Sequence, residues 1–289
     1  MIYRQMGTTG IQVSALGLGA MPLSIEGRPE ESQAVQVIET FLDLGGNFID
    51  TANVYCLDDG DIGHNERLVR RALTDLGKGD KVVVATKGGL RRPRGGWVTD
   101  GSPAWLRESC ERSLRDLGVE RITLYQLHAV DARVGLLPSL EALIRLREQG
   151  KIRHIGLSNV SLDQLQQALD LTAIATVQNR CNPFEKDDLK NGMIDFCREQ
   201  GISYIPHSPV GGHHGHVRLG RPGLLSGLAR KYGVSAYQVV LAWFLSKGEH
   251  IIPIPGASKV TSIRDSMAAV DLMLEPEDIR AIDGMPDDE

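Results

Sequence analysis

The sequence predicts an α/β fold and, within that class, a (β/α)8 TIM barrel. Two observations lead to this prediction. Eight short apolar or β-branched runs recur along the 289 residues, and amphipathic segments with helix-capping signals separate them. The GxGxxG pattern of an open dinucleotide-binding sheet is absent, because its nearest match, "GLGAMP" at residues 17–22, has only two of the glycines. We therefore expect parallel strands joined by right-handed crossovers that close into a barrel.

The eight predicted strands are short and apolar, and turn-forming or polar residues follow most of them. They are expected at residues 15–19, 46–50, 81–87, 122–128, 152–158, 174–178, 202–206 and 251–255. Before the first of these strands, the turn residues "GTTG" at 7–10 predict a β-hairpin that closes the barrel floor. With no linker or low-complexity tract in the sequence, residues 1–289 are expected to form a single domain.

Capping residues mark three of the helices between these strands. The segment 102–119 begins with Ser102 before a first-turn proline and stops at Gly118. The segments 161–171 and 235–248 each open with a serine, which is a favoured N-cap residue.

Composition excludes several classes of protein. A net charge of −5 gives no basic surface for nucleic acid or for an anionic membrane. The four cysteines show no CxxC spacing, so neither a zinc site nor a disulfide framework is predicted. No signal peptide or membrane span is recognisable, so we expect a cytoplasmic monomer or weak homo-oligomer that acts on a small molecule.

Polar side chains stand at the ends of three consecutive predicted strands. Asp50 ends the second strand, Lys87 the third and His128 the fourth, and Tyr55 follows in the loop after Asp50. Because parallel barrel strands present their carboxyl ends at one face, the four side chains are expected to share a pocket. Four chemically complementary groups at one face predict an active site.

These four groups suit the reduction of a carbonyl. A free phenol is too weak an acid for rapid proton donation near neutral pH, and the ammonium of Lys87 is expected to lower the pKa of Tyr55 below that of a free phenol. Asp50 would hold Lys87 in place, and the imidazole of His128 would orient the carbonyl oxygen. The protein has no hydride of its own, so a nicotinamide would have to supply it.

Five motifs occur in the order "DTANVY", "ATKGG", "LYQLH", "GLSNVS" and "PIPGAS". They resemble motifs of the aldo-keto reductase superfamily, and the resemblance spans essentially the whole chain. It implies a (β/α)8 barrel that binds NADPH without a Rossmann fold, with NADH less favoured. It also implies that Tyr55 is the general acid, that Lys87 and Asp50 tune it, and that His128 orients the carbonyl.

The resemblance further implies where NADPH lies. Ser158 and Asn159, with Gln178, match residues that hold the nicotinamide carboxamide, and His207 stands where the family has an aromatic ring that stacks on the nicotinamide. The complete set of implied cofactor contacts is Ala20, Met21, Asp50, Ser158, Asn159, Gln178, His207, Ser208, Pro209, Val210, Gly211, Pro255, Gly256, Ala257, Ser258, Lys259, Arg264 and Asp265.

Within this set, Ser258 and Lys259 precede a helix, where an anion is well placed, and they match the segment that grips the adenosine 2′-phosphate. Ser262 and Ser266 replace the usual arginine and asparagine there, and Arg264 is a candidate substitute for the missing arginine.

The substrate pocket is expected to include Met21, Val54 and Trp97, with the loop 91–101 over it. No metal is expected, because the histidines of "GGHHGH" at 211–216 lack a carboxylate partner and a rigid element. Two other functions remain open. One is a Schiff-base lyase that uses Lys87, which the nearby Asp50 disfavours because it keeps the amine charged. The other is an NADPH-binding redox sensor of the same fold.

Overall fold

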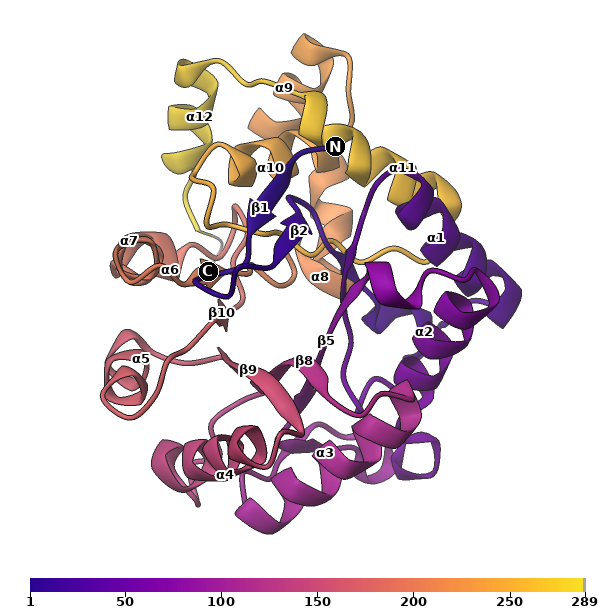
Figure 1. Cartoon of the computed structure of the whole chain (residues 1–289). Coiled ribbons are helices and arrows are strands. Elements are labelled where there is room, and N and C mark those ends of the chain that lie inside the picture. The colour runs from indigo at the N-terminus through magenta and orange to yellow at the C-terminus, as the bar shows by residue number, and fades with distance from the viewer. Residues whose placement is uncertain (288–289) are drawn as a thin grey trace.

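The computed structural model describes residues 1–287, apart from the side chains of His213 and His214. Helices surround a central group of strands, and the hairpin β1–β2 crosses the centre of the view in Figure 1. The strands are β1 Tyr3–Gln5, β2 Gln12–Ser14, β3 Leu18–Gly19, β4 Phe48–Asp50, β5 Val83–Gly88, β6 Leu90–Arg91, β7 Val98–Thr99, β8 Ile122–Leu127, β9 Ile152–Ser158, β10 Thr176–Gln178 and β11 Ser203–Tyr204.

The helices follow the strands in alternation along most of the chain. They are α1 Glu31–Asp43, α2 His64–Asp75, α3 Pro103–Leu117, α4 Leu136–Glu148, α5 Leu162–Leu169, α6 Asp187–Lys190, α7 Met193–Glu199, α8 Gly212–Gly215, α9 Leu224–Tyr232, α10 Ala236–Leu245, α11 Val260–Ala268 and α12 Pro276–Asp283. Among the described residues, no helix is both long enough and apolar enough to cross a membrane.

Seven strands form one parallel sheet in the order β11-β10-β9-β8-β5-β4-β3. Each of them lies within one of the strand ranges predicted from the sequence, to within one residue at the end of β5. The register sets the site, because Asp50 pairs with Ala85 on β5 and Lys87 pairs with Gln126 on β8. The carboxyl ends of β4, β5 and β8 are thus adjacent.

The eighth predicted strand, 251–255, does not form a regular strand. Its sequence "IIPIP" contains two prolines, which have no N–H to donate to a ladder. The segment nevertheless bridges the two ends of the sheet, because Tyr204 pairs with Ile251 in parallel and Gly19 pairs with Gly256 in parallel. Both edges of the curled sheet therefore contact this segment, as a (β/α)8 barrel requires.

Serine caps position three helices as predicted. The Ser102 hydroxyl accepts a hydrogen bond from the Trp105 N–H at 3.3 Å, and α3 ends at Gly118 with φ 68°. Ser161 forms a capping box with Gln164 at the start of α5, and Ser235 caps α10. These caps form as predicted because each of them depends only on residues that are close in sequence.

The hairpin β1–β2 packs its inward side chains against the sheet. Met6 and Val13 are fully buried and share a cluster with Phe48, Leu124 and Ile252, which lie on three of the surrounding segments. A second, short hairpin pairs β6 with β7 and includes most of the loop 91–101.

Candidate active site

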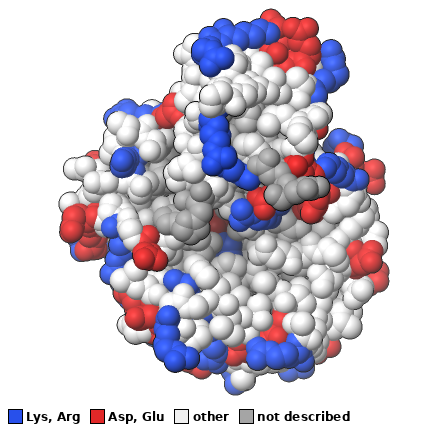
Figure 2. Space-filling view, turned by 180° about the vertical axis from the view of Figure 1, so that it is seen from behind, with Lys and Arg blue, Asp and Glu red and all other residues white. Residues whose placement is uncertain are grey.

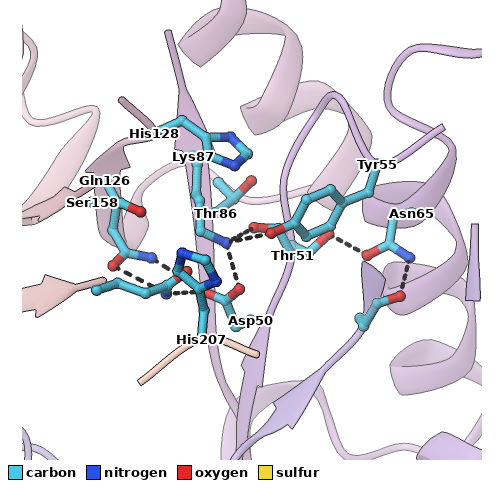
Figure 3. A network of polar contacts seen from close by, with 12 residues as sticks. Asp50, Thr51, Tyr55, Asn65, Thr86, Lys87, Gln126, His128, Ser158 and His207 are labelled. Carbon is cyan, nitrogen blue, oxygen red and sulfur yellow. Dashed lines mark hydrogen bonds and ion pairs between the residues drawn. The ribbon is translucent and has the colours of Figure 1, made fainter. Parts of the chain in front are cut away.

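The Lys87 ammonium lies at the centre of a buried polar network at the carboxyl ends of β4 and β5. It donates to the Asp50 carboxylate, to the Tyr55 hydroxyl at 2.9 Å and to the Thr51 carbonyl at 3.0 Å. Figure 3 shows the ammonium pointing between Asp50 and Tyr55. Lys87 is fully buried and Asp50 almost so, which makes this an ion pair shielded from solvent. The structure therefore brings together Asp50 and Lys87, which the sequence placed at strand ends, and Tyr55 from the loop after Asp50.

Asp50 is held from two further strands. Gln126 on β8 donates to its Oδ2 at 3.1 Å, and Gln178 on β10 donates to the same atom at 2.8 Å. A buried charge needs its remaining lone pairs satisfied, and these two amides do so. Sequence reasoning missed Gln126, although it lies two residues before His128 within the predicted strand 122–128 and so is expected to share its face.

Burial decides the ionisation of Tyr55. It raises the pKa of Tyr55, the Lys87 ammonium lowers it, and the net direction is upward. The expectation that this phenol would titrate below a free phenol is therefore wrong, because loss of solvent outweighs the adjacent charge. At neutral pH Tyr55 keeps its proton, which is the form that a proton donor needs.

Burial and neighbouring charges also determine the ionisation of Lys87 and His128. Burial lowers the pKa of Lys87, but the Asp50 carboxylate and Tyr55 phenol outweigh that effect and the pKa is raised, so the amine stays protonated. Burial, with the charge of Lys87, holds the pKa of His128 well below its usual range, so its imidazole is neutral. The Nδ1 atom of His128 is buried and has no hydrogen-bond partner among the described residues.

Three rings meet edge-to-face at the opening of this site. The Tyr55 and His128 ring centroids are 5.8 Å apart, and Trp97 lies 6.4 Å from Tyr55 and 6.5 Å from His128. Trp97 is 48% exposed although it adjoins a buried phenol, so its free face is open to a ligand. Met21 packs against a small apolar cluster that contains Tyr55 and Val54, and Val54 is fully buried.

Arg92 fixes the position of Trp97, and sequence reasoning missed it. Its guanidinium lies 3.9 Å from the centroid of the Trp97 ring and donates to the carbonyls of Cys56 and Leu57, in the loop that carries Tyr55. It also donates to the carbonyl of Gly95. A buried arginine within "RRPRGG" cannot be told from its exposed neighbours by sequence alone.

Two of the predicted nicotinamide contacts, Asn159 and His207, are hydrogen-bonded to each other beside this network. The Asn159 amide donates to the His128 carbonyl at 2.9 Å and its Oδ1 lies 3.1 Å from Nε2 of His207. Asn159 and Ser208 have positive φ angles of 55° and 53°, and a third such residue, Arg94, lies in the β6–β7 hairpin. Among non-glycine residues such backbones are strained and concentrate at ligand sites. Burial, together with Lys87 and Arg180, lowers the pKa of His207 to about 3, so its ring is neutral.

Other predicted cofactor residues follow the carboxyl ends of strands. Ala20 ends the turn after β3, where its N–H donates to the Asp50 carbonyl at 2.9 Å, and Gly211 has φ 92° in the turn after Ser208. The remaining residues of the set lie on two segments. Pro209 and Val210 follow β11, and Pro255, Gly256 and Ala257 lie at the end of the bridging segment 251–255 and just after it.

The predicted phosphate grip lies at the start of α11. Lys259 is the N-cap residue of this helix, and both Lys259 and Arg264 are exposed, without an ion pair to any described residue. Asp265, by contrast, already accepts hydrogen bonds from Ser235 and Gln238, each at 2.6 Å. Its carboxylate thus joins α11 to α10.

Charges of both signs are spread around the rim of the face in Figure 2, with basic side chains near its centre.

No group of three or more His, Cys, Asp or Glu side chains that could hold a metal ion occurs in the described part of the chain. Within the histidine tract 211–216, the side chains of His213 and His214 lie outside the described part of the chain.

Comparison with known proteins agrees with this geometry. A family model described as the aldo/keto reductase family matches residues 15–287. The probable aldo-keto reductase 1 of Glycine max is 33% identical, over 96% of this chain and 87% of its own length. Pyridoxine 4-dehydrogenase of Escherichia coli (strain K12) is 34% identical, over 94% of this chain and 95% of its own.

Solved structures give the same result. An aldo-keto reductase from Bacillus halodurans in its holo form has a TM-score of 0.82 at 26% identity and covers 98% of this chain and 95% of its own. The glycerol dehydrogenase of Gluconobacter oxydans has a TM-score of 0.82 at 28% identity and covers 97% and 94%. With the polar network at the strand ends, these matches show that the chain belongs to the aldo/keto reductase family of oxidoreductases.

Proposed function

We propose that this protein reduces an aldehyde or ketone to an alcohol with NADPH, and that Tyr55 is the general acid. The observation that carries the proposal is the fully buried Lys87, which contacts the Asp50 carboxylate and the Tyr55 hydroxyl at once. Two relatives are named as dehydrogenases, one of pyridoxine and one of glycerol, and this supports interconversion of an alcohol and a carbonyl.

The residues perform the proton side of the reaction. Tyr55 donates its proton to the carbonyl oxygen, and the Lys87 ammonium stabilises the phenolate that is left behind. Asp50 holds Lys87 in place, and the neutral imidazole of His128 fixes the position of the carbonyl oxygen with a ring nitrogen. When bound, the reduced nicotinamide supplies the hydride. The open face of Trp97 and the side chain of Met21 favour a substrate with an apolar portion.

The residues at the mouth fit a nicotinamide. Asn159 and Ser158 present an amide and a hydroxyl group beside the network. The backbone of Asn159 has a positive φ angle and is strained. His207 presents a neutral ring in place of the family's larger aromatic. Gln178 contributes less than the resemblance implies, because its amide nitrogen is already bound to Asp50.

NADPH is proposed over NADH because Lys259 stands free at the N-terminus of α11. The helix end attracts an anion, and Lys259 adds a full charge for the 2′-phosphate. Lys259→Ala should weaken NADPH binding roughly ten- to a hundred-fold and leave NADH binding nearly unchanged. Fluorescence titration of both cofactors against Lys259→Ala and Arg264→Ala measures this. Equal losses for both cofactors would show that Lys259 does not recognise the phosphate.

The proposed reaction is tested with a panel of aldehydes and ketones, read by loss of reduced-nicotinamide absorbance. Tyr55→Phe should lower turnover by at least about 10²–10⁴-fold while NADPH still binds, because the proton is needed only in the transition state. Full activity in Tyr55→Phe would overturn the assignment. Cofactor binding without turnover of any substrate would favour the redox sensor. Borohydride trapping of a substrate on Lys87 would favour the lyase, which the raised pKa of Lys87 opposes.

We also infer that residues 1–289 act as one domain whose hairpin β1–β2 closes the floor of the barrel. The burial of Met6 and Val13 among side chains of the surrounding strands supports this position.

A further inference from the structure

A basic hollow lies on the opposite side of the barrel from the proposed active site. It has a volume of about 210 Å³ and is formed where the hairpin turn meets α4 and the first residues of β9. Ser158 and Asn159 stand at the other end of β9, so a ligand here would not compete with the substrate. At roughly 30 Å³ for each water molecule, the hollow has room for a hydrated oxyanion or for the phosphate of a small ester.

Two arginines line the hollow without a counterion. The guanidinium groups of Arg147 at the end of α4 and Arg153 on β9 make no ion pair or hydrogen bond with any described residue. None of the described residues that line the hollow carries a carboxylate. In a chain with a net charge of −5, two cations that face one space without an acid form a local positive field.

His154 provides a second, independent observation. Its Nε2 atom is buried and has no hydrogen-bond partner among the described residues, although buried polar atoms in native structures are usually paired. Arg153 and Arg147, after burial, are the groups that lower the pKa of His154. An anion in the hollow would offset the positive charges of Arg147 and Arg153 and would change the electrostatic potential at the His154 ring.

The hairpin turn that contributes to the hollow is held close to the neighbouring strands. The Gly7 N–H donates to the Ser203 hydroxyl at 2.8 Å, and Gly7 approaches so closely that a Cβ there would lie 2.5 Å from the Ala175 carbonyl oxygen. With φ 53°, Gly7 also adopts a backbone conformation that favours glycine. The turn therefore holds Thr8 and Thr9 at the edge of the hollow in the folded protein.

We propose that this hollow binds a phosphate group, either as inorganic phosphate or as a phosphate monoester, between Arg147 and Arg153. The planar guanidinium matches two phosphate oxygens at once, and two such groups suit a dianion. Thr8, at the edge of the hollow, carries a hydroxyl that could donate a further hydrogen bond.

The first experiment measures affinity on the full chain. Inorganic phosphate is titrated by calorimetry at constant ionic strength, and we expect saturable binding that weakens roughly tenfold or more in the double variant Arg147→Gln/Arg153→Gln. The matched control is Arg145→Gln, an exposed arginine on the same helix that does not line the hollow, and it should bind as the wild type does. Repeating the comparison in a Lys259→Ala background should give the same loss in the double variant, which separates this hollow from the proposed cofactor site. Equal affinity in the double variant, or no saturation, would overturn the proposal.

The second experiment needs no variant. Sulfate does not titrate near neutral pH, so the pKa of His154 can be followed by NMR with and without it. We expect the pKa of His154 to rise when sulfate binds, because the anion offsets the charges of Arg147 and Arg153. An unchanged His154 would count against the site even if some phosphate bound elsewhere. Comparison of inorganic phosphate with glycerol phosphate then identifies the source, since tighter binding of the ester would assign the hollow to a phosphorylated metabolite.

Discussion

Glu66 is a fully buried carboxylic acid behind the proposed active site. It accepts a hydrogen bond at 2.6 Å from Thr86, the residue next to Lys87 on β5. The pKa of Glu66 is raised to about 7, because burial and, to a smaller extent, the charge of Asp116 raise it more than Thr86, Ser113 and Arg67 lower it. Its folded pKa thus exceeds the value of 4.5 for an ordinary glutamate.

This shift has a defined effect on stability. Between pH 4.5 and about 7 the unfolded chain loses the proton of this residue while the folded chain keeps it, so stability falls as the pH rises through that window. At 1.36 kcal/mol for each pKa unit, the loss is about 3 kcal/mol. Glu66→Gln cannot ionise, and its free energy of unfolding relative to the wild type should therefore rise by about that amount between pH 5 and pH 8.

Urea unfolding of both proteins at several pH values measures the difference. The exposed Glu148→Gln is the matched control, and its difference from the wild type should stay constant with pH. A constant difference for Glu66→Gln as well would show that Glu66 is ionised in the folded protein.

At this scale the sequence predicted which groups lie together in the proposed site but not their protonation. Asp50, Lys87 and Tyr55 were predicted because their residue types and their positions at or just after a strand end are local properties. The net pKa of Tyr55 depends on how completely the fold removes water, which outweighs the effect of Lys87. Arg92 became recognisable only when its partners were placed, whereas Gln126 could have been found from its two-residue spacing to His128.

The hairpin β6–β7 is the element that the structure ties most directly to the proposed catalytic loop. Arg92 joins the two, because it stacks on Trp97 and donates to the carbonyls of Cys56 and Leu57. Arg92→Ala should release Trp97 from its place beside Tyr55. We expect KM for a bulky aromatic aldehyde to rise about tenfold, with a smaller rise for a short aldehyde that makes little contact with Trp97.

Steady-state kinetics with the two aldehydes measures this. Arg94→Ala serves as the control, because its side chain is exposed in the same hairpin and has no described partner. If Arg92→Ala left the ratio of the two KM values unchanged, Trp97 would not form a substrate wall.

Elements were predictable to the degree that their signals are local. The serine caps of α3, α5 and α10 hold because a hydroxyl reaches an N–H three residues later. The segment 251–255 differs because its apolar pattern predicts a strand while its prolines prevent a regular one. Its place in the fold is set by the two sheet edges that it bridges.

At the scale of the whole molecule, the residues of the proposed site come together because the two edges of the sheet are joined. Residues more than a hundred positions apart, Asp50 and Gln178, touch only if the parallel sheet curls. The sequence predicted this arrangement because eight alternating strands and helices have few compact solutions. The contact that joins the N-terminal strand to the last crossover was not predictable, because it involves backbone carbonyls that any sequence carries.

Arg4 makes that contact. Its buried guanidinium, on β1, donates to the carbonyls of Leu245, Gly248 and Ile251, at the entrance to the bridging segment. Hydrogen bonds from a charged group contribute roughly 1.5–3 kcal/mol each and are not additive, so Arg4→Met should cost about 3 kcal/mol of unfolding free energy. For a chain of this size, that loss lowers Tm by several degrees. Calorimetric unfolding measures it, with Tyr3→Phe as the control, because Tyr3 on the same strand donates one exposed hydrogen bond to the Gly45 carbonyl. Activity at 25 °C should persist in Arg4→Met, since Arg4 lies on the hairpin and not in the network around Lys87. A Tm equal to that of Tyr3→Phe would mean that the first strand and the bridging segment hold together without Arg4.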